Sequence, residues 1–181
     1  MERRDFLTVA GCSLGMCCCT GAATTQPAQP SDNPQVRELR QKVDFMQKSM
    51  ARLVAALDEP TRKRVLETMG RECAKASQRE REKFKGKPAE FVAALRRQWI
   101  EESSEYDEQT GRMRIVGKPS PCPCAFVRVG LTPPEFCQCS VGWLKEVYSD
   151  ILGRPVDAEI ETSTLRGGRQ CISRIQPSQT G

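Results

Sequence analysis

The first regular pattern in the chain is a run of apolar residues at alternating spacings of three and four. Such spacing places side chains on one face of an α-helix. Asn33 and Pro34, just ahead of the run, suit a helix cap and a first helical residue. The face either packs on the core of its own chain, which a run of this length favours, or forms the seam of a homodimer. The apolar positions are Val36, Leu39, Val43, Met46, Met50, Leu53 and Leu57.

Two further helices are each opened by a proline. In the helix that begins near Pro60, Cys73 shares a face with Val65, Leu66 and Met69, so we expect it to be a small core residue. The helix that begins at Pro88 is expected to turn Phe91, Val92, Leu95 and Trp99 inward. The charged segments 77–87 and 101–108 are expected to be solvated, the second as a turn.

After Gly111 the period of the pattern falls from about 3.6 to 2, which indicates strands. The sequence therefore predicts an α+β fold, in which N-terminal helices pack on an antiparallel β-β-α-β-β sheet unit. A single domain is expected over residues 35–176, helical in 35–108 and β-β-α-β-β in 112–175, followed by a tail at 177–181. The strands are expected at 113–116, 122–129, 156–162 and 169–175, with a helix at 140–152 and a hairpin turn at 167–168.

Five cysteines in the C-terminal half have spacings that point to chemistry. Cys122 and Cys124 lie two residues apart in a predicted strand, which puts both sulfurs on one face. Cys137 and Cys139 come just before the predicted helix, with Ser140 as its N-cap, and a helix N-terminus favours the thiolate. The hairpin can return Cys171 to the same place, so we expect the sulfurs to meet.

Three interpretations of these sulfurs remain open. In the first, four of the five thiolates hold zinc or an iron–sulfur cluster, with Glu161 able to replace one of them. Their single-residue spacing differs from the usual Cys-x-x-Cys of zinc sites. In the second, the cysteines form disulfides, whose pairing the sequence does not fix. In the third, Cys137 or Cys139 is the nucleophile or redox thiol of an enzyme.

The composition narrows these choices. The chain has 181 residues, enough for one ordinary domain, and contains no histidine. That absence excludes Cys–His and Ser–His catalytic pairs and imidazole metal ligands. The net charge of +5 comes with only 6% aromatic residues, so nucleic acid is not expected as a partner.

The N-terminus is expected to be an export signal. Residues 3–7, Arg-Arg-Asp-Phe-Leu, match the twin-arginine pattern, and the apolar run at 6–19 is too short for a stable transmembrane segment. We expect residues 1–23 to be a signal peptide recognised by the twin-arginine translocase, and 24–34 to be a flexible linker. The mature protein is then exported to the periplasm or cell envelope. The alternative is lipid anchoring at a cysteine such as Cys12, but the apolar run before that residue is short.

Three segments of the C-terminal region carry a family resemblance: 139–145, 152–156 and 165–171, which read Cys-Ser-Val-Gly-Trp-Leu-Lys, Leu-Gly-Arg-Pro-Val and Leu-Arg-Gly-Gly-Arg-Gln-Cys. Over about residues 137–175 the chain resembles the 4-vinyl-reductase-type small-molecule-binding domains. It is also similar to bacterial proteins of an aminothiazoline-carboxylate-hydrolase-like group, in which residues 70–74 match a Gly-Arg-x-Cys-Ala helix.

The resemblance implies a mixed α/β sandwich with an antiparallel sheet and a zinc ion held by cysteines and a glutamate near the hairpin. It maps this ligand set onto Cys171, with Glu161 and either Cys139 or Cys137. Where the family often has a further cysteine, this chain has Thr164. We therefore expect an exported, cysteine-rich domain that binds or senses a small molecule and has a thiolate metal site. The alternatives are a thiol-dependent hydrolase or redox enzyme and a disulfide-stabilised interaction domain.

Overall fold

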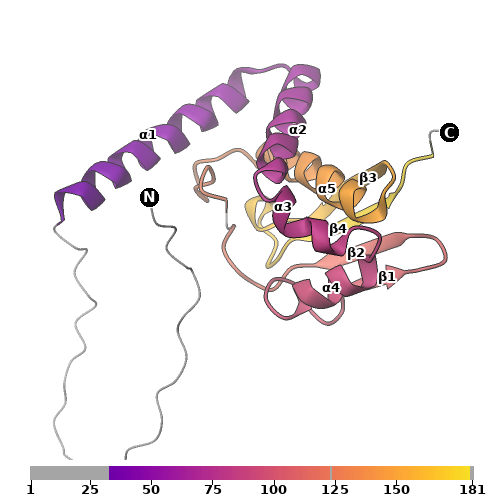
Figure 1. The fold of residues 1–181 in the computed structure, drawn as a ribbon. Helices are drawn as coiled ribbons and strands as arrows, with labels where there is room; N and C mark the ends of the chain where they lie inside the picture. The colour runs from indigo at the N-terminus through magenta and orange to yellow at the C-terminus, as the bar shows by residue number, and fades with distance from the viewer. Residues whose placement is uncertain (1–32, 123, 180–181) are drawn as a thin grey trace, which may run out of the picture.

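The computed structural model describes residues 33–122 and 124–179 (Figure 1). The expected signal peptide, its lipidation site and nearly all of the expected linker lie outside the described residues. No helix of the described part is both long enough and apolar enough to cross a membrane.

Helix α1 (Pro34–Ala56) begins where the sequence predicts. The Asn33 side chain accepts a hydrogen bond from the Gln35 N–H at 2.9 Å, and Pro34 is the first helical residue. Only the second half of this helix packs on the body, through the buried residues Ala51 and Val54. Figure 1 shows the other half extending away from the body. The predicted apolar face packs on the body only in part: Met50 lies against the buried cluster of Val54, Leu66 and Phe136, whereas Leu39 is 61% exposed and Leu53 47% exposed. The homodimer seam stays a prediction.

Helix α2 (Glu59–Lys75) is capped by Asp58, which accepts a hydrogen bond from the Thr61 N–H at 3.0 Å. It packs along α5 (Cys137–Leu152) at very short range. Glycines make this approach feasible, because a Cβ at Gly70 would overlap the Cys139 carbonyl and one at Gly142 would overlap the Glu67 carbonyl. The α2–α5 pair is therefore fixed by its backbones as well as by its apolar side chains.

Two short helices, α3 (Gln78–Arg81) and η1 (Glu82–Phe84), link α2 to α4 (Pro88–Arg96). The expectation that this link is solvated is wrong at Arg81, because that side chain is buried. Its guanidinium donates a hydrogen bond to the Ala74 carbonyl at 2.7 Å and forms an ion pair with Asp150 at 2.8 Å. Helix α4 buries Phe91 and Val92, as predicted.

Trp99 was expected to face inward with the apolar residues of α4, and that prediction is wrong. The helix ends at Arg96, so the helical spacing that would bring Trp99 to the inner face no longer applies. The indole is 62% exposed.

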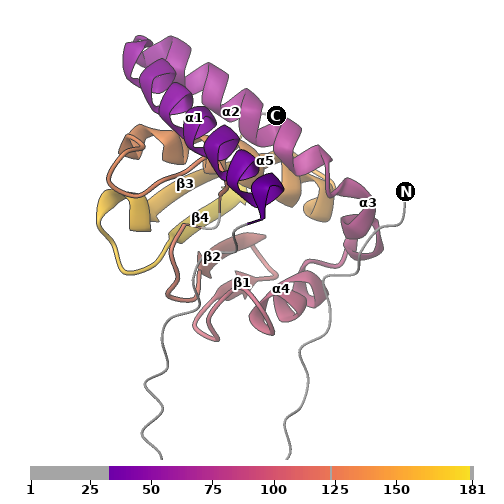
Figure 2. The same cartoon turned by 90° about the vertical axis from the view of Figure 1, so that its left-hand side faces the viewer.

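The four strands form one antiparallel sheet in the order β1-β2-β4-β3. Ile175 of β4 stands opposite Met113 of β2 on one side and Ala158 of β3 on the other. Helix α5 packs on this sheet through buried side chains such as Val147 and Ile151, and Figure 2 shows the sheet beneath the helices. The predicted α+β class and the helix between two strand pairs are confirmed. The strands are β1 (Glu105–Asp107), β2 (Arg112–Val116), β3 (Val156–Thr162) and β4 (Ile172–Pro177).

One strand lies in a different place from the prediction. The acidic segment expected to be a solvated turn contains β1, whose Glu105 stands opposite Arg114. Residues 122–129 were predicted as a strand, and the described part of that segment contains none. Prolines at 121 and 123 lack the N–H that a strand ladder requires, which accounts for the difference.

The molecule has two apolar cores. The larger lies between α5 and the sheet and includes Tyr148, Ile151 and Ile175. The smaller core lies where α1, α2 and the start of α5 meet, and consists of Val54, Leu66 and Phe136. Its margin is formed by half-buried apolar and sulfur-containing side chains, namely Met50, Met69, Cys124, Phe126, Val127, Cys139 and Leu165. This margin borders the site described next.

Candidate functional site

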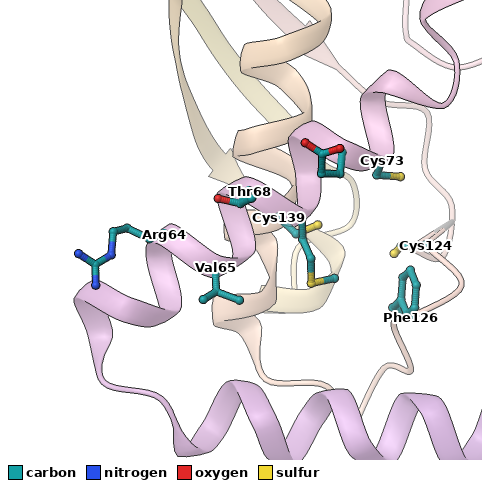
Figure 3. A pocket seen from close by; sticks show the side chains of 9 residues that line it. Arg64, Val65, Thr68, Cys73, Cys124, Phe126 and Cys139 are labelled. Carbon is teal, nitrogen blue, oxygen red and sulfur yellow. The ribbon is translucent and has the colours of Figure 1, made fainter.

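A pocket of about 670 Å³ opens at the margin of the smaller core. One wall is a face of α2, on which the lining residues recur at helical spacing. The other side is formed by Cys124 and Phe126 from the irregular segment 122–132 and by Cys139 from α5 (Figure 3). The lining residues from α2 are Arg64, Val65, Thr68, Met69, Glu72 and Cys73.

Helix α1 holds the segment that carries Cys124 and Phe126. The Gln47 side-chain amide donates to the Ala125 carbonyl at 2.9 Å and to the Val127 carbonyl at 3.4 Å. One turn earlier on the same helix, Asp44 forms an ion pair with Arg128. The position of the pocket's outer wall therefore depends on α1.

Cys139 lies in the first turn of α5, beneath Gly70 of α2. Burial is the main cause that raises the pKa of its thiol to about 12, and the nearby thiols of Cys124, Cys73 and Cys122 contribute to the same rise. Cys139 is therefore a neutral thiol at physiological pH, and it contributes soft apolar surface to the pocket.

A second group of sulfurs lies near the hairpin between β3 and β4. The buried Cys137 Sγ is 3.1 Å from the Ser163 hydroxyl, and the Cys171 Sγ is 3.9 Å from the Thr164 hydroxyl. Burial raises the pKa of Cys137, and the thiols of Cys171 and Cys122 act in the same direction despite the opposing hydrogen bond from Ser163.

The pKa of Cys122 is likewise raised, chiefly by burial and also by the Cys124 and Cys171 thiols. A thiol that shifts the pKa of another must lie within its electrostatic range. Cys137 and Cys171 thus lie at the hairpin, Cys124 and Cys139 line the pocket, and Cys122 influences thiols of both groups.

Two expectations about individual residues are wrong. Cys73 is not a core residue: it is exposed and lines the pocket, because its face of α2 borders the cavity at that level. Ser140 is not a helix cap. Helix α5 already begins at Cys137, directly after the 3₁₀ turn η2 (Pro134–Phe136), and no side chain caps it.

The carboxylate of Glu161 is engaged away from the sulfurs. Arg114 and Arg174 from the neighbouring strands donate to it at 3.1 Å and 2.6 Å. Within residues 33–122 and 124–179, no three Cys, Asp or Glu side chains are arranged to hold one metal ion. The six cysteines there are free thiols. The metal and disulfide hypotheses both stay predictions.

Comparisons with known proteins give a structural likeness only. No protein-family model matches the sequence, and no curated protein matches it. Among solved structures, the chain is similar to a trafficking protein particle complex subunit 3 from Naegleria fowleri covalently bound to palmitic acid. The TM-score is 0.50 at 16% identity, over 77% of this chain and 97% of that one. The two proteins share a fold.

A second similar structure is the phenol-responsive sensory domain of the transcription activator PoxR, determined with phenol. Here the TM-score is 0.45 at 10% identity, over 75% of this chain and 74% of that one.

The apolar lining of the pocket was missed in the sequence. Val65 and Met69 were interpreted as core residues because they share a helical face with Cys73. Phe126 was placed in a strand. No local signal in the sequence distinguishes a helix face that covers a core from one that lines a cavity. In the structure Val65 remains 38% exposed.

Proposed function

We propose that this protein is a small-molecule-binding domain that takes an apolar, chain-like ligand of the fatty-acyl class. The observation that carries the proposal is the pocket itself. Its volume of about 670 Å³ falls within the range of roughly 300–1,000 Å³ typical of ligand sites. Its walls include Val65, Met69 and Phe126, so an acyl chain in the pocket is removed from water at a gain of about 0.8 kcal/mol per methylene.

The fold likeness supports the choice of ligand class. The trafficking subunit with the shared fold is covalently bound to palmitic acid. The sulfurs of Cys124 and Cys139 add polarizable surface that adapts to an acyl chain.

The test is a titration of the full chain with a fluorescent long-chain fatty acid, followed by displacement with palmitate. Val65→Trp fills the pocket from a partly exposed position, so the chain should still fold and lose most of its affinity. Val129→Trp is the matched control, because Val129 is exposed and does not line the pocket. Absence of binding by the natural chain, or equal binding by both variants, would refute the proposal.

A thiolate metal site is the second candidate function. The observation in its favour is that Cys122, Cys137 and Cys171 lie within electrostatic range of one another. Thiolates of this kind hold zinc or iron–sulfur clusters. Within the described residues, however, no three Cys, Asp or Glu side chains are arranged so that they could hold one metal ion. Elemental analysis of protein purified without oxygen tests the metal site. Bound metal in the natural chain that is lost in Cys137→Ser or Cys171→Ser would support the site. A natural chain without metal would contradict it.

Export to the periplasm or cell envelope is proposed on the sequence alone, from the arginine pair and the apolar run behind it. Cell fractionation of the natural chain and of a variant with Arg3→Lys and Arg4→Lys tests it. Retention of only the variant in the cytoplasm is the expected result. Retention of both forms would contradict export.

A further inference from the structure

We propose that the pocket selects ligands with a free anionic head group, and that Arg64 recognises that group. The ligand is then a long-chain carboxylate held without a covalent bond, and not an acyl group attached to a cysteine. This inference rests on the proposed function, since it names the head group of a ligand whose chain occupies the pocket.

The geometry gives the pocket two chemically different ends. The α2 wall runs from Arg64 to Cys73, nine residues or about 13 Å along the helix axis. Figure 3 shows Arg64 at one end of this row of side chains and Cys73 at the other, with Val65 and Thr68 between them. An extended chain along this wall therefore presents its head group either to the arginine or to the cysteine.

The charges distinguish the two ends. Two of the lining residues are charged, Arg64 and Glu72. Glu72 is neutralised by Lys75, whose ammonium lies 2.7 Å from the carboxylate. Within the described part of the chain, Arg64 forms no ion pair, and its guanidinium makes one long hydrogen bond, 3.5 Å to the Thr61 hydroxyl.

Arg64 makes a small contribution to the lowered pKa of the Asp58 carboxyl, which is caused chiefly by the hydrogen bonds with Thr61. The Asp58 side chain is committed elsewhere, because it accepts the hydrogen bond from the Thr61 N–H that caps α2. The guanidinium thus keeps donors for a ligand. A guanidinium is planar, stays charged and matches a carboxylate with two parallel hydrogen bonds, which gives it a preference for an acid over an alcohol of the same chain length.

The experiment compares dodecanoate with 1-dodecanol as competitors for the fluorescent probe on the full chain. For the natural chain we expect dodecanoate to bind about twofold to fivefold more tightly, the size of one exposed charged contact. Arg64→Gln should remove this preference, because it weakens the binding of dodecanoate and leaves the binding of 1-dodecanol unchanged. Arg64→Lys should keep part of the preference. Lys63→Gln is the matched control, because it removes the same charge one residue away from the pocket lining.

The outcomes separate this inference from the proposed function. If both competitors bind equally and Arg64→Gln changes neither affinity, the head-group inference is overturned and the pocket proposal stands. If neither competitor binds the natural chain, both fall. If mass spectrometry under denaturing conditions finds an acyl mass that hydroxylamine removes, the ligand is a thioester and the free-acid inference is overturned.

Discussion

Gly70 of α2 lies directly against the carbonyl oxygen of Cys139 in α5, with no room for a Cβ between the two backbones. The contact places the first turn of α5 under α2, where the Cys139 side chain becomes part of the pocket lining. Gly70 of α2 and Cys139 of α5 can lie this close because glycine has no side chain. This close approach accounts for a glycine in a helix interior, where it otherwise costs stability.

Replacing Gly70 with alanine should destabilise the fold by about 3 kcal/mol, because the overlap is with backbone atoms that no rotamer change relieves. It should also weaken probe binding, since α2 must move away from Cys139. Urea unfolding and the probe titration measure both effects. Gly130→Ala is the control: its φ of +84° costs about 1 kcal/mol, but nothing lies within 4 Å of the added Cβ. Equal losses in the two variants would contradict the account.

The Glu67 carboxylate gives α2 and α5 a pH-dependent contact. Burial acts to raise its pKa, but hydrogen bonds from Lys145 at 3.0 Å and Gln138 at 2.6 Å outweigh it and lower the pKa below the ordinary 4.5. A lowered folded-state pKa contributes stability above the ordinary value, and this is lost as the pH falls through the folded-state pKa.

The natural chain should therefore lose more stability than Glu67→Gln as the pH is lowered below 4.5. At neutral pH the variant should be less stable by about 1–2 kcal/mol, the cost of weakening a partly buried charged hydrogen bond. Thermal unfolding at a series of pH values gives the comparison. Parallel stability profiles for the two proteins would show that Glu67 does not make this contribution.

Alkylation should distinguish the pocket thiols from one another. With a pKa of about 12, only about one Cys139 side chain in ten thousand is ionised at about pH 8, whereas Cys73 is exposed. Iodoacetamide at that pH should modify Cys73 first and leave Cys139 and Cys137 unmodified until the protein unfolds. Peptide mass spectrometry gives the order of modification. Fast labelling of Cys137 or Cys139 in the folded chain would instead support the thiol-enzyme hypothesis.

The contact between α1 and the outer wall of the pocket can be tested through one side chain. Gln47→Ala removes the hydrogen bonds to the Ala125 and Val127 carbonyls, at a cost of about 1 kcal/mol. Hydrogen exchange in segment 124–131 should become faster, and probe affinity should fall by about fivefold. Gln41→Ala, on an exposed part of the same helix, should change neither. Unchanged exchange in Gln47→Ala would mean that α1 does not hold this wall.

The elements that could be predicted from the sequence are those with strong local signals. Asn33, Pro60 and Pro88 indicated the helix starts, and alternation located β2 and β3. Strand β1 escaped because it is a short edge strand whose residues are mostly exposed, so it shows no apolar alternation. Strand β1 is stabilised by its pairing with β2, and the local sequence pattern does not reveal that pairing.

The site was predictable only in part. The cysteine spacings predicted that sulfurs from three segments meet; in the structure Cys137 and Cys171 lie near the hairpin, and Cys124 and Cys139 line the pocket. The pocket could not be predicted in the same way, because an apolar helical face looks the same whether a core or a cavity covers it. The role of α2 in the pocket follows from the close approach at Gly70 and from the position of segment 122–132, both of which are tertiary properties.

The most direct measurement is photo-crosslinking of the full chain with a fatty acid that carries a diazirine near the end of its acyl chain, followed by peptide mapping. The account predicts adducts on the pocket lining, chiefly at Met69, Phe126 and Cys139, which excess palmitate suppresses and Val65→Trp abolishes. Adducts spread over exposed surfaces such as Phe45 of α1, insensitive to palmitate and to Val65→Trp, would contradict it.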